Sequence, residues 1–182
     1  MKATGIVRRI DDLGRVVIPK EIRRTLRLGE GTPLEIFTDR EGEIILKKYS
    51  PMCEMSAFAI QYAEAMALAT GLMVCITDRD QVIAVAGGSK KGLIQKNISR
   101  QLETLINERE AVLAKRDEKT YVPISAEEIE GVTAQAVMPI ISEGDAIGAV
   151  ALLSRDNKAN FGDTELKLVG TAAGFLGRQM EG

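Results

Sequence analysis

The residues best suited to chemistry in this sequence are positively charged and lie near its N-terminus. Seven cations fall between residues 5 and 28: Arg8, Arg9, Arg15, Lys20, Arg23, Arg24 and Arg27. An arginine is charged at any physiological pH, and its planar guanidinium can donate paired hydrogen bonds to phosphate oxygens or to guanine. Single surface cations contribute little, but this density indicates a surface that binds a polyanion.

The charge is distributed unevenly along the chain. Residues 1–50 hold 11 Lys and Arg against 8 Asp and Glu, a net charge of +3, whereas residues 51–182 hold 13 against 18, a net charge of −5. This asymmetry predicts an anion-binding domain at 1–50 followed by an acidic globular domain at 54–182. The junction Ser50-Pro51-Met52 is too short for a flexible linker, so we expect the two domains to be coupled.

The sequence contains few of the residue patterns that enzymes use for catalysis. It contains no histidine, which excludes Ser-His-Asp and Cys-His nucleophiles and His-ligated zinc. Cys53 and Cys75 lack metal-site spacing and are expected to be small buried apolar residues. We therefore identify no catalytic residue, metal site or cofactor. With no signal peptide and no apolar run of membrane-spanning length, we expect a cytoplasmic protein without a membrane partner.

Short elements must position the N-terminal cations. Four segments have the β-branched or alternating pattern of strands: 6–10, 16–18, 34–38 and 43–47. The string Asp11-Asp12-Leu13-Gly14 is typical of a turn, and Pro19 of the first position of a helix. Fifty residues without a metal or a disulfide are marginally stable alone, so these elements predict a dimer.

The N-terminal string resembles a known family. Lys2 to Pro19, with Leu13-Gly14-Arg15-Val16-Val17-Ile18-Pro19 as its core, is similar to the N-terminal domain of AbrB-type transition-state regulators. The resemblance extends to Tyr49 and implies a swapped-hairpin β-barrel, in which two chains interleave and present basic residues to double-stranded DNA. The positions that match the DNA-contacting arginines of the family are Arg8, Arg15, Arg23 and Arg24. Lys2, Arg9 and Lys20 are expected to contact phosphates, which orient a protein without reading sequence.

Two longer helices are predicted in the second domain, at 54–70 and at about 163–180. Each carries an apolar seam with heptad-like spacing, and the seam residues are Met55, Phe58 and Tyr62, then Leu166, Val169, Ala173 and Leu176. A second apolar stripe beside each seam indicates that one face packs on the chain's own sheet and the other on a second copy. Burial of both helices in a single core remains the alternative, because each seam is short for a coiled coil.

The segments between these helices predict an antiparallel sheet. Four strands are expected at 72–77, 81–86, 134–141 and 146–153, with a helix at 93–109 and an exposed charged run at 115–119. The fold class is therefore α+β.

The strings at 75–80, 134–140 and 148–152, with Phe161 and Glu165 opening the last helix, resemble a GAF-type sensor domain. That resemblance implies a small ligand of unknown identity held between sheet and loops. The absence of histidine argues against haem, and neither cysteine lies in an obvious bilin-attachment context.

An AbrB-like domain followed by a GAF-like domain is similar in order and length to a family of sporulation transcription factors. The resemblance implies an activator and repressor at the nucleoid of the forespore, and a homotetramer of swapped dimers joined through GAF helices. The alternative is a ligand-sensing interaction module whose basic face binds an acidic protein. A milder variant is an architectural DNA-binding protein whose GAF-like domain serves assembly alone. A strong salt dependence of duplex binding would favour DNA, since each phosphate contact adds about 0.9 to the slope.

Overall fold

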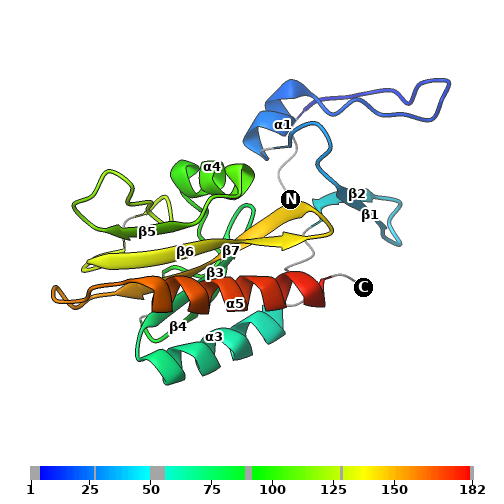
Figure 1. Ribbon diagram of the computed structural model, residues 1–182. Coiled ribbons are helices and arrows are strands. Elements are labelled where there is room, and N and C mark those ends of the chain that lie inside the picture. The colour runs from blue at the N-terminus through cyan, green and yellow to red at the C-terminus, as the bar shows by residue number, and fades with distance from the viewer. Residues whose placement is uncertain (1–4, 27, 50–55, 89–91, 128, 181–182) are drawn as a thin grey trace. The chain divides into compact units, whose positions relative to one another are not determined.

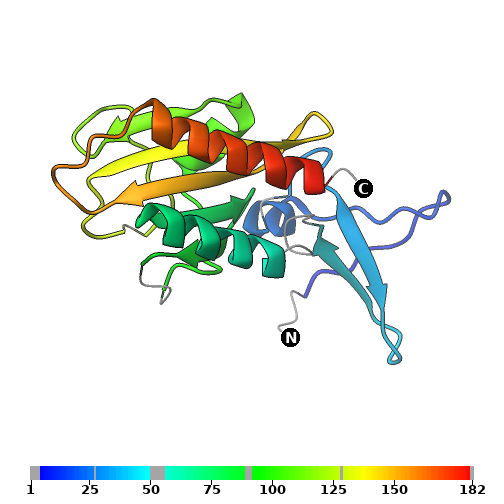
Figure 2. The same ribbon diagram turned by 60° about the horizontal axis from the view of Figure 1, so that its bottom comes forward.

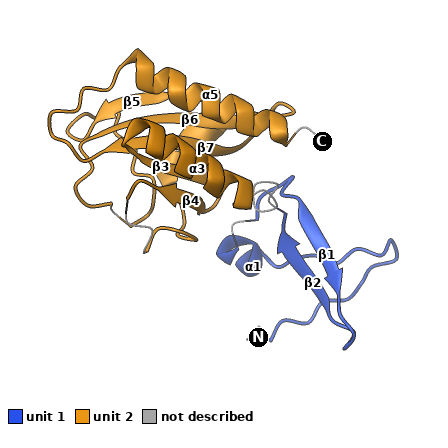
Figure 3. Ribbon diagram, turned by 90° about the horizontal axis from the view of Figure 1, so that it is seen from below, with its two compact units in different colours: residues 1–49 blue, residues 50–182 orange. Residues whose placement is uncertain are grey.

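A computed structural model of the chain describes residues 5–26, 28–49, 56–88, 92–127 and 129–180. The chain divides into two compact units, unit 1 (residues 1–49) and unit 2 (residues 50–182), which are coloured separately in Figure 3. Lys2, Cys53, Met55 and the expected junction at 50–52 lie outside the described residues.

Unit 1 contains one short helix and one hairpin. The helix α1 (Lys20–Thr25) begins directly after Pro19, which occupies the N-cap rather than the expected first helical position. The strands β1 (Leu34–Thr38) and β2 (Ile44–Lys48) pair in antiparallel register, with Ile36 opposite Leu46 (Figure 1). The predicted second hairpin is thereby confirmed.

Residues 5–19 form no strand in the single chain, so the prediction of strands at 6–10 and 16–18 is wrong for the chain alone. A β-branched run becomes a strand only when a neighbouring strand completes its backbone hydrogen bonds. In unit 1, β1 and β2 are paired with each other. The apolar side chains of the extended runs therefore stay in solvent, with Ile6 40% and Val7 87% exposed.

Unit 2 is built on a five-stranded antiparallel sheet of order β4-β3-β7-β6-β5. In chain order the strands are β3 (Met73–Asp78), β4 (Val82–Ala86), β5 (Val112–Lys115), β6 (Ala134–Ser142) and β7 (Asp145–Ser154). Helices α3 (Ser56–Thr70) and α5 (Asp163–Gln179) run side by side over one face, and α4 (Arg100–Glu108) covers the other (Figures 1 and 2). This arrangement confirms the predicted antiparallel sheet and adds β5, which is only four residues long.

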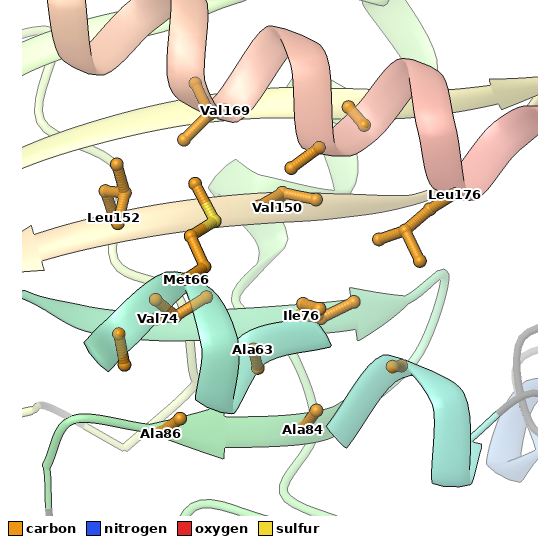
Figure 4. Close-up of a cluster of buried hydrophobic side chains, with 14 of the residues drawn as sticks. Ala63, Met66, Val74, Ile76, Ala84, Ala86, Val150, Leu152, Val169 and Leu176 are labelled. Atoms are coloured by element: carbon orange, nitrogen blue, oxygen red, sulfur yellow. The ribbon is translucent and has the colours of Figure 1, made fainter. Parts of the chain in front are cut away.

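Both faces of the sheet are covered, and this explains why its central strands are almost continuously apolar. All six residues of β3 are buried. Val74 and Ile76 pack with α3 and α5 (Figure 4), whereas Met73 and Cys75 belong to the cluster that contains Leu102 of α4. The core therefore consists of two apolar layers, one on each side of the sheet.

Helix α4 is shorter than the helix predicted at 93–109. It starts after Ser99, whose hydroxyl accepts a hydrogen bond from the backbone N–H of Leu102 at 3.0 Å and so caps the helix. The residues before Ser99 are held by β4 instead, because Val82 N donates to Lys96 O and Gln95 N donates to Val82 O. Tertiary hydrogen bonds therefore override the local helical pattern there.

Helix α5 lies so close to the end of β6 that one of its glycines leaves no room for a side chain. A Cβ at Gly177 would lie 2.0 Å from the carbonyl oxygen of Ile141, whereas a Cβ at Gly174 would have no neighbour within 4 Å. We expect Gly177→Ala to lower the free energy of unfolding by about 1–3 kcal/mol, because the helix must move away from the sheet. Gly174→Ala is the matched control and should raise it by up to about 1 kcal/mol, because alanine favours a helix. Denaturant unfolding of the full chain measures both, and equal effects would contradict the close packing.

Candidate nucleic-acid interface

The turn at residues 11–15 is organised by the side chain of Asp11. Its Oδ1 accepts hydrogen bonds from the backbone amides of Leu13 at 3.0 Å and Arg15 at 2.8 Å. The backbone closes the same turn, because Asp11 N donates to Arg15 O and Gly14 N donates to Asp11 O, both at 3.0 Å. Gly14 has φ +78°, a left-handed conformation that glycine adopts without steric cost.

The second carboxylate oxygen of Asp11 holds the side chain of Arg15. Arg15 Nε donates to Asp11 Oδ2 at 2.8 Å, and the two side chains are 68% and 35% exposed, respectively. The backbone amide of Arg15 first, and its guanidinium second, hold the pKa of Asp11 below its ordinary value. The carboxylate is therefore ionised at neutral pH, and Arg15 is oriented before any ligand arrives.

The remaining cations named from the sequence are exposed on the neighbouring segments. Arg8 and Arg9 lie in the extended run before the turn, and Lys20, Arg23 and Arg24 lie on α1. Within the described part of the chain, Arg15 is the one of these six cations that forms an ion pair. We call the six residues the basic surface; its members are Arg8, Arg9, Arg15, Lys20, Arg23 and Arg24.

Unit 1 also exposes far more apolar surface than a stable domain does. Among the described residues, 12 of the 17 large hydrophobic residues that are exposed belong to unit 1. A groove of about 690 Å³ runs through this unit, lined by residues that include Ile6, Val16, Val17, Ile22, Leu34 and Leu46. Exposed apolar surface of this extent is typical of a face that another chain covers.

The apolar seams named from the sequence divide between the core and the surface of unit 2. Val169, Ala173 and Leu176 are at most 3% exposed and pack in the core beside the sheet, so the expectation that they face a partner is corrected. Leu166 is half-buried against the same core. The physical reason is the direction in which each residue points from the helix. Val169, Ala173 and Leu176 point toward the sheet, whereas Phe175 lies on the side of α5 that faces outward.

An aromatic cluster lies between the outer sides of α3 and α5. The ring centroid of Phe175 lies 5.7 Å from that of Phe58 and 5.5 Å from that of Tyr62, and the Tyr62 ring is stacked on it. Phe58 and Tyr62 are half-buried, and partial burial raises the pKa of Tyr62. These two residues from the predicted seam, with Phe175 and Leu168, form the partly exposed apolar face of the helical layer.

Unit 2 holds a small hollow of about 180 Å³ on the segment from Arg116 to Ile129. The guanidinium of Arg116 lies 4.8 Å from the ring centroid of Tyr121, and its Nη1 donates to the Tyr121 hydroxyl at 3.1 Å. The hollow therefore presents a cation beside an aromatic ring.

Cys75 is the described cysteine, and it is fully buried. Burial raises the pKa of the Cys75 thiol to about 12, so it stays protonated at neutral pH and cannot act as a thiolate nucleophile. No group of three or more Asp, Glu or Cys residues in the described ranges could hold a metal ion. In the same ranges, no helix combines the length and the apolar character needed to cross a membrane.

Comparison with known proteins gives two family models that together span nearly the whole chain. A model described as the C-terminal, transcription-factor part of stage V sporulation protein T matches residues 54–181. A model described as MazE, a bacterial antitoxin of antidote-toxin recognition, matches residues 7–54. Stage V sporulation protein T of Bacillus subtilis (strain 168) is 55% identical over 181 residues, which cover 100% of this chain and 99% of that relative. The chain belongs to the stage V sporulation protein T family.

Two further similarities each concern one of the two units of the chain. The transition state regulatory protein AbrB of Bacillus subtilis (strain 168) is 65% identical over 51 residues, 28% of this chain and 52% of AbrB, which confirms the AbrB-type N-terminus. The GAF domain region of a protein from Geobacter sulfurreducens matches 70% of the chain and 93% of that structure, with 16% identity and a TM-score of 0.52. The fold of unit 2 is therefore GAF-like.

Sequence reasoning missed the role of Asp11, although a signal was present. An aspartate three residues before a glycine is typical of a turn in which the carboxylate accepts backbone N–H groups. The spacing occurs at Asp11-x-x-Gly14 and again at Asp39-x-x-Gly42.

Proposed function

We propose that this member of the stage V sporulation protein T family binds double-stranded DNA through the basic surface. The observation that carries the proposal is the exposure of six cations on three consecutive segments, in the part of the chain that is 65% identical to AbrB. Arginine forks and lysine ammonium groups contact phosphates, and arginines also read guanine edges. Arg8, Arg15, Arg23 and Arg24 are assigned to the principal contacts, and Arg9, Lys20 and Lys2 to phosphates.

A second copy of the chain completes unit 1 in this proposal. The unpaired runs at 6–10 and 16–18 pair with the corresponding segments of the partner in a swapped-hairpin barrel. The supporting observations are the absence of strands at 5–19 and the apolar groove of about 690 Å³. The dimer then presents two copies of the basic surface to the duplex.

Unit 2 serves assembly and sensing. The partly exposed apolar face of α3 and α5 pairs two swapped dimers into a homotetramer, because its aromatic cluster of Phe58, Tyr62 and Phe175 is suited to a buried contact. A small ligand in the hollow beside Arg116 would bias the geometry of the basic surfaces only if it prefers one assembly state. The protein acts without catalysis, as activator and repressor in the cytoplasm of the forespore.

The test is the salt dependence of binding between the full chain and a duplex of randomised sequence. If phosphate contacts dominate, the logarithm of the association constant falls with the logarithm of salt concentration with a slope steeper than about −4. Fluorescence anisotropy of a labelled duplex between 50 and 300 mM salt, about the range in which such slopes are resolved, measures it. Undetectable binding, or a slope near zero, would remove DNA as the partner and favour an acidic protein on the same surface.

A further inference from the structure

We propose that Asp11 is a positioning residue that orients Arg15 to read a guanine in the major groove. The inference rests on the proposed DNA binding and assigns one arginine of the basic surface to a base edge. Asp11 Oδ2 accepts a hydrogen bond from Arg15 Nε at 2.8 Å and so holds the guanidinium at the nitrogen nearest the aliphatic part of the side chain. Among the described residues, no acceptor contacts the terminal nitrogens Nη1 and Nη2 of Arg15.

The chain contains the same turn a second time without the arginine. In the β1–β2 connection, Asp39 Oδ1 accepts from the backbone amides of the third and fifth residues of the turn, as Asp11 Oδ1 does, at distances between 2.8 and 3.0 Å in both turns. In each turn the aspartate N–H donates to the carbonyl oxygen of the fifth residue. The fifth residue is Arg15 in one turn and Glu43 in the other. The turn therefore needs one carboxylate oxygen, and at Asp11 the other oxygen is left to hold Arg15.

The carboxylate of Asp11 lies among the cations of the proposed DNA-binding surface, where a negative charge is unfavourable for binding DNA. A carboxylate repels the phosphates of the duplex and so weakens binding that depends on charge alone. An exposed ion pair adds little to folding stability, which leaves orientation as its role. A guanidinium held at Nε presents Nη1 and Nη2 as a pair of donors, the arrangement that matches O6 and N7 of guanine.

The experiment compares Asp11→Asn with Asp39→Asn in the full-length protein. Asparagine keeps an acceptor oxygen for the turn but replaces the second oxygen with an NH₂ group, which cannot accept a hydrogen bond from Nε. The wild type first selects its preferred site from a pool of randomised duplexes. Affinities of all three proteins are then measured for that site, for its single base-pair variants and for random duplex.

We expect the wild type to prefer G·C at one base pair of each half-site by about 5- to 150-fold, the range of one bidentate contact. Asp11→Asn should reduce that preference to below about threefold while random duplex is bound equally or more tightly, since a negative charge has been removed. Asp39→Asn should behave as the wild type. Arg15→Lys, which keeps the charge but lacks the fork, should lose preference at the same base pair.

The outcomes separate this inference from the proposed function. A wild type that binds no duplex would overturn DNA binding itself. A wild type that binds without sequence preference, or an Asp11→Asn variant that keeps its preference at every base pair, would overturn the role of Asp11 alone. The role of Asp11 would also be overturned if Asp39→Asn lost as much base preference as Asp11→Asn. It would be overturned too if Asp11→Asn and Arg15→Lys lost preference at different base pairs.

Discussion

Replacing Arg23 and Arg24 together by alanine lowers the affinity for duplex DNA by about 10²- to 10³-fold at 0.1 M salt and flattens the salt dependence. Both side chains are exposed in the last turn of α1. A dimer presents two copies of each, four cations in all, so the slope should decrease by about 4 × 0.9, or 3.6, if every one contacts a phosphate. The measurement is a salt titration of the wild type and the double variant on one duplex, with the mass of each protein determined by light scattering.

The control for this prediction removes the same charge from unit 2. Lys158 and Lys167 are exposed there, and Lys158→Ala/Lys167→Ala changes the net charge by the same amount. Its affinity and slope should stay close to those of the wild type. Equal losses in the two double variants would mean that overall charge, rather than the basic surface, controls binding.

Leu46→Asp should prevent the pairing of unit 1 and halve the mass of the proposed tetramer. Leu46 lines the apolar groove and is 44% exposed in the single chain. In the proposed swapped barrel we expect the partner to cover this position, where burying an unpaired carboxylate is strongly unfavourable. Because the basic surface is then no longer assembled from two chains, duplex binding should fall at least about a hundredfold, as expected when several phosphate contacts are lost together.

The matched substitution at Leu13 distinguishes pairing from a general effect of the acid. Leu13 is 70% exposed in the turn and does not line the groove. Leu13→Asp should therefore keep the wild-type mass in light scattering and its thermal transition, whatever it does to DNA affinity. An unchanged mass for Leu46→Asp would argue against the groove as the pairing surface.

The fold of unit 2 could be predicted from the sequence because its signals are local. The strands β3, β4, β6 and β7 were recognisable as apolar runs around turns, and α5 as a long apolar-striped segment. The α4 boundary could not be predicted, because its start depends on hydrogen bonds that Gln95 and Lys96 form with Val82 of β4, which is distant from them in sequence. The seam of α5 was assigned to the wrong stripe, because two adjacent apolar stripes do not reveal which one meets the sheet.

The candidate site was predictable in its charges and not in its geometry. The cations follow from composition, and the AbrB-type string assigns roles to four of them. The pairing of Arg15 with Asp11 depends on the turn placing a carboxylate oxygen 2.8 Å from Nε, which spacing alone does not give. The sequence predicts strands at 6–10 and 16–18 in a barrel of two chains, and the single chain leaves both runs without a strand partner.

The unpaired runs of unit 1 have a consequence for the timing of activity. If two chains must meet before the DNA-binding unit can fold, the amount of active protein rises with roughly the square of the total while the protein is scarce. Pairing through unit 2 would hold two N-terminal segments at a high effective concentration and so favour their folding together. A cell that accumulates this chain gradually would then gain DNA binding over a narrow interval of protein level, without any change in the rate of synthesis.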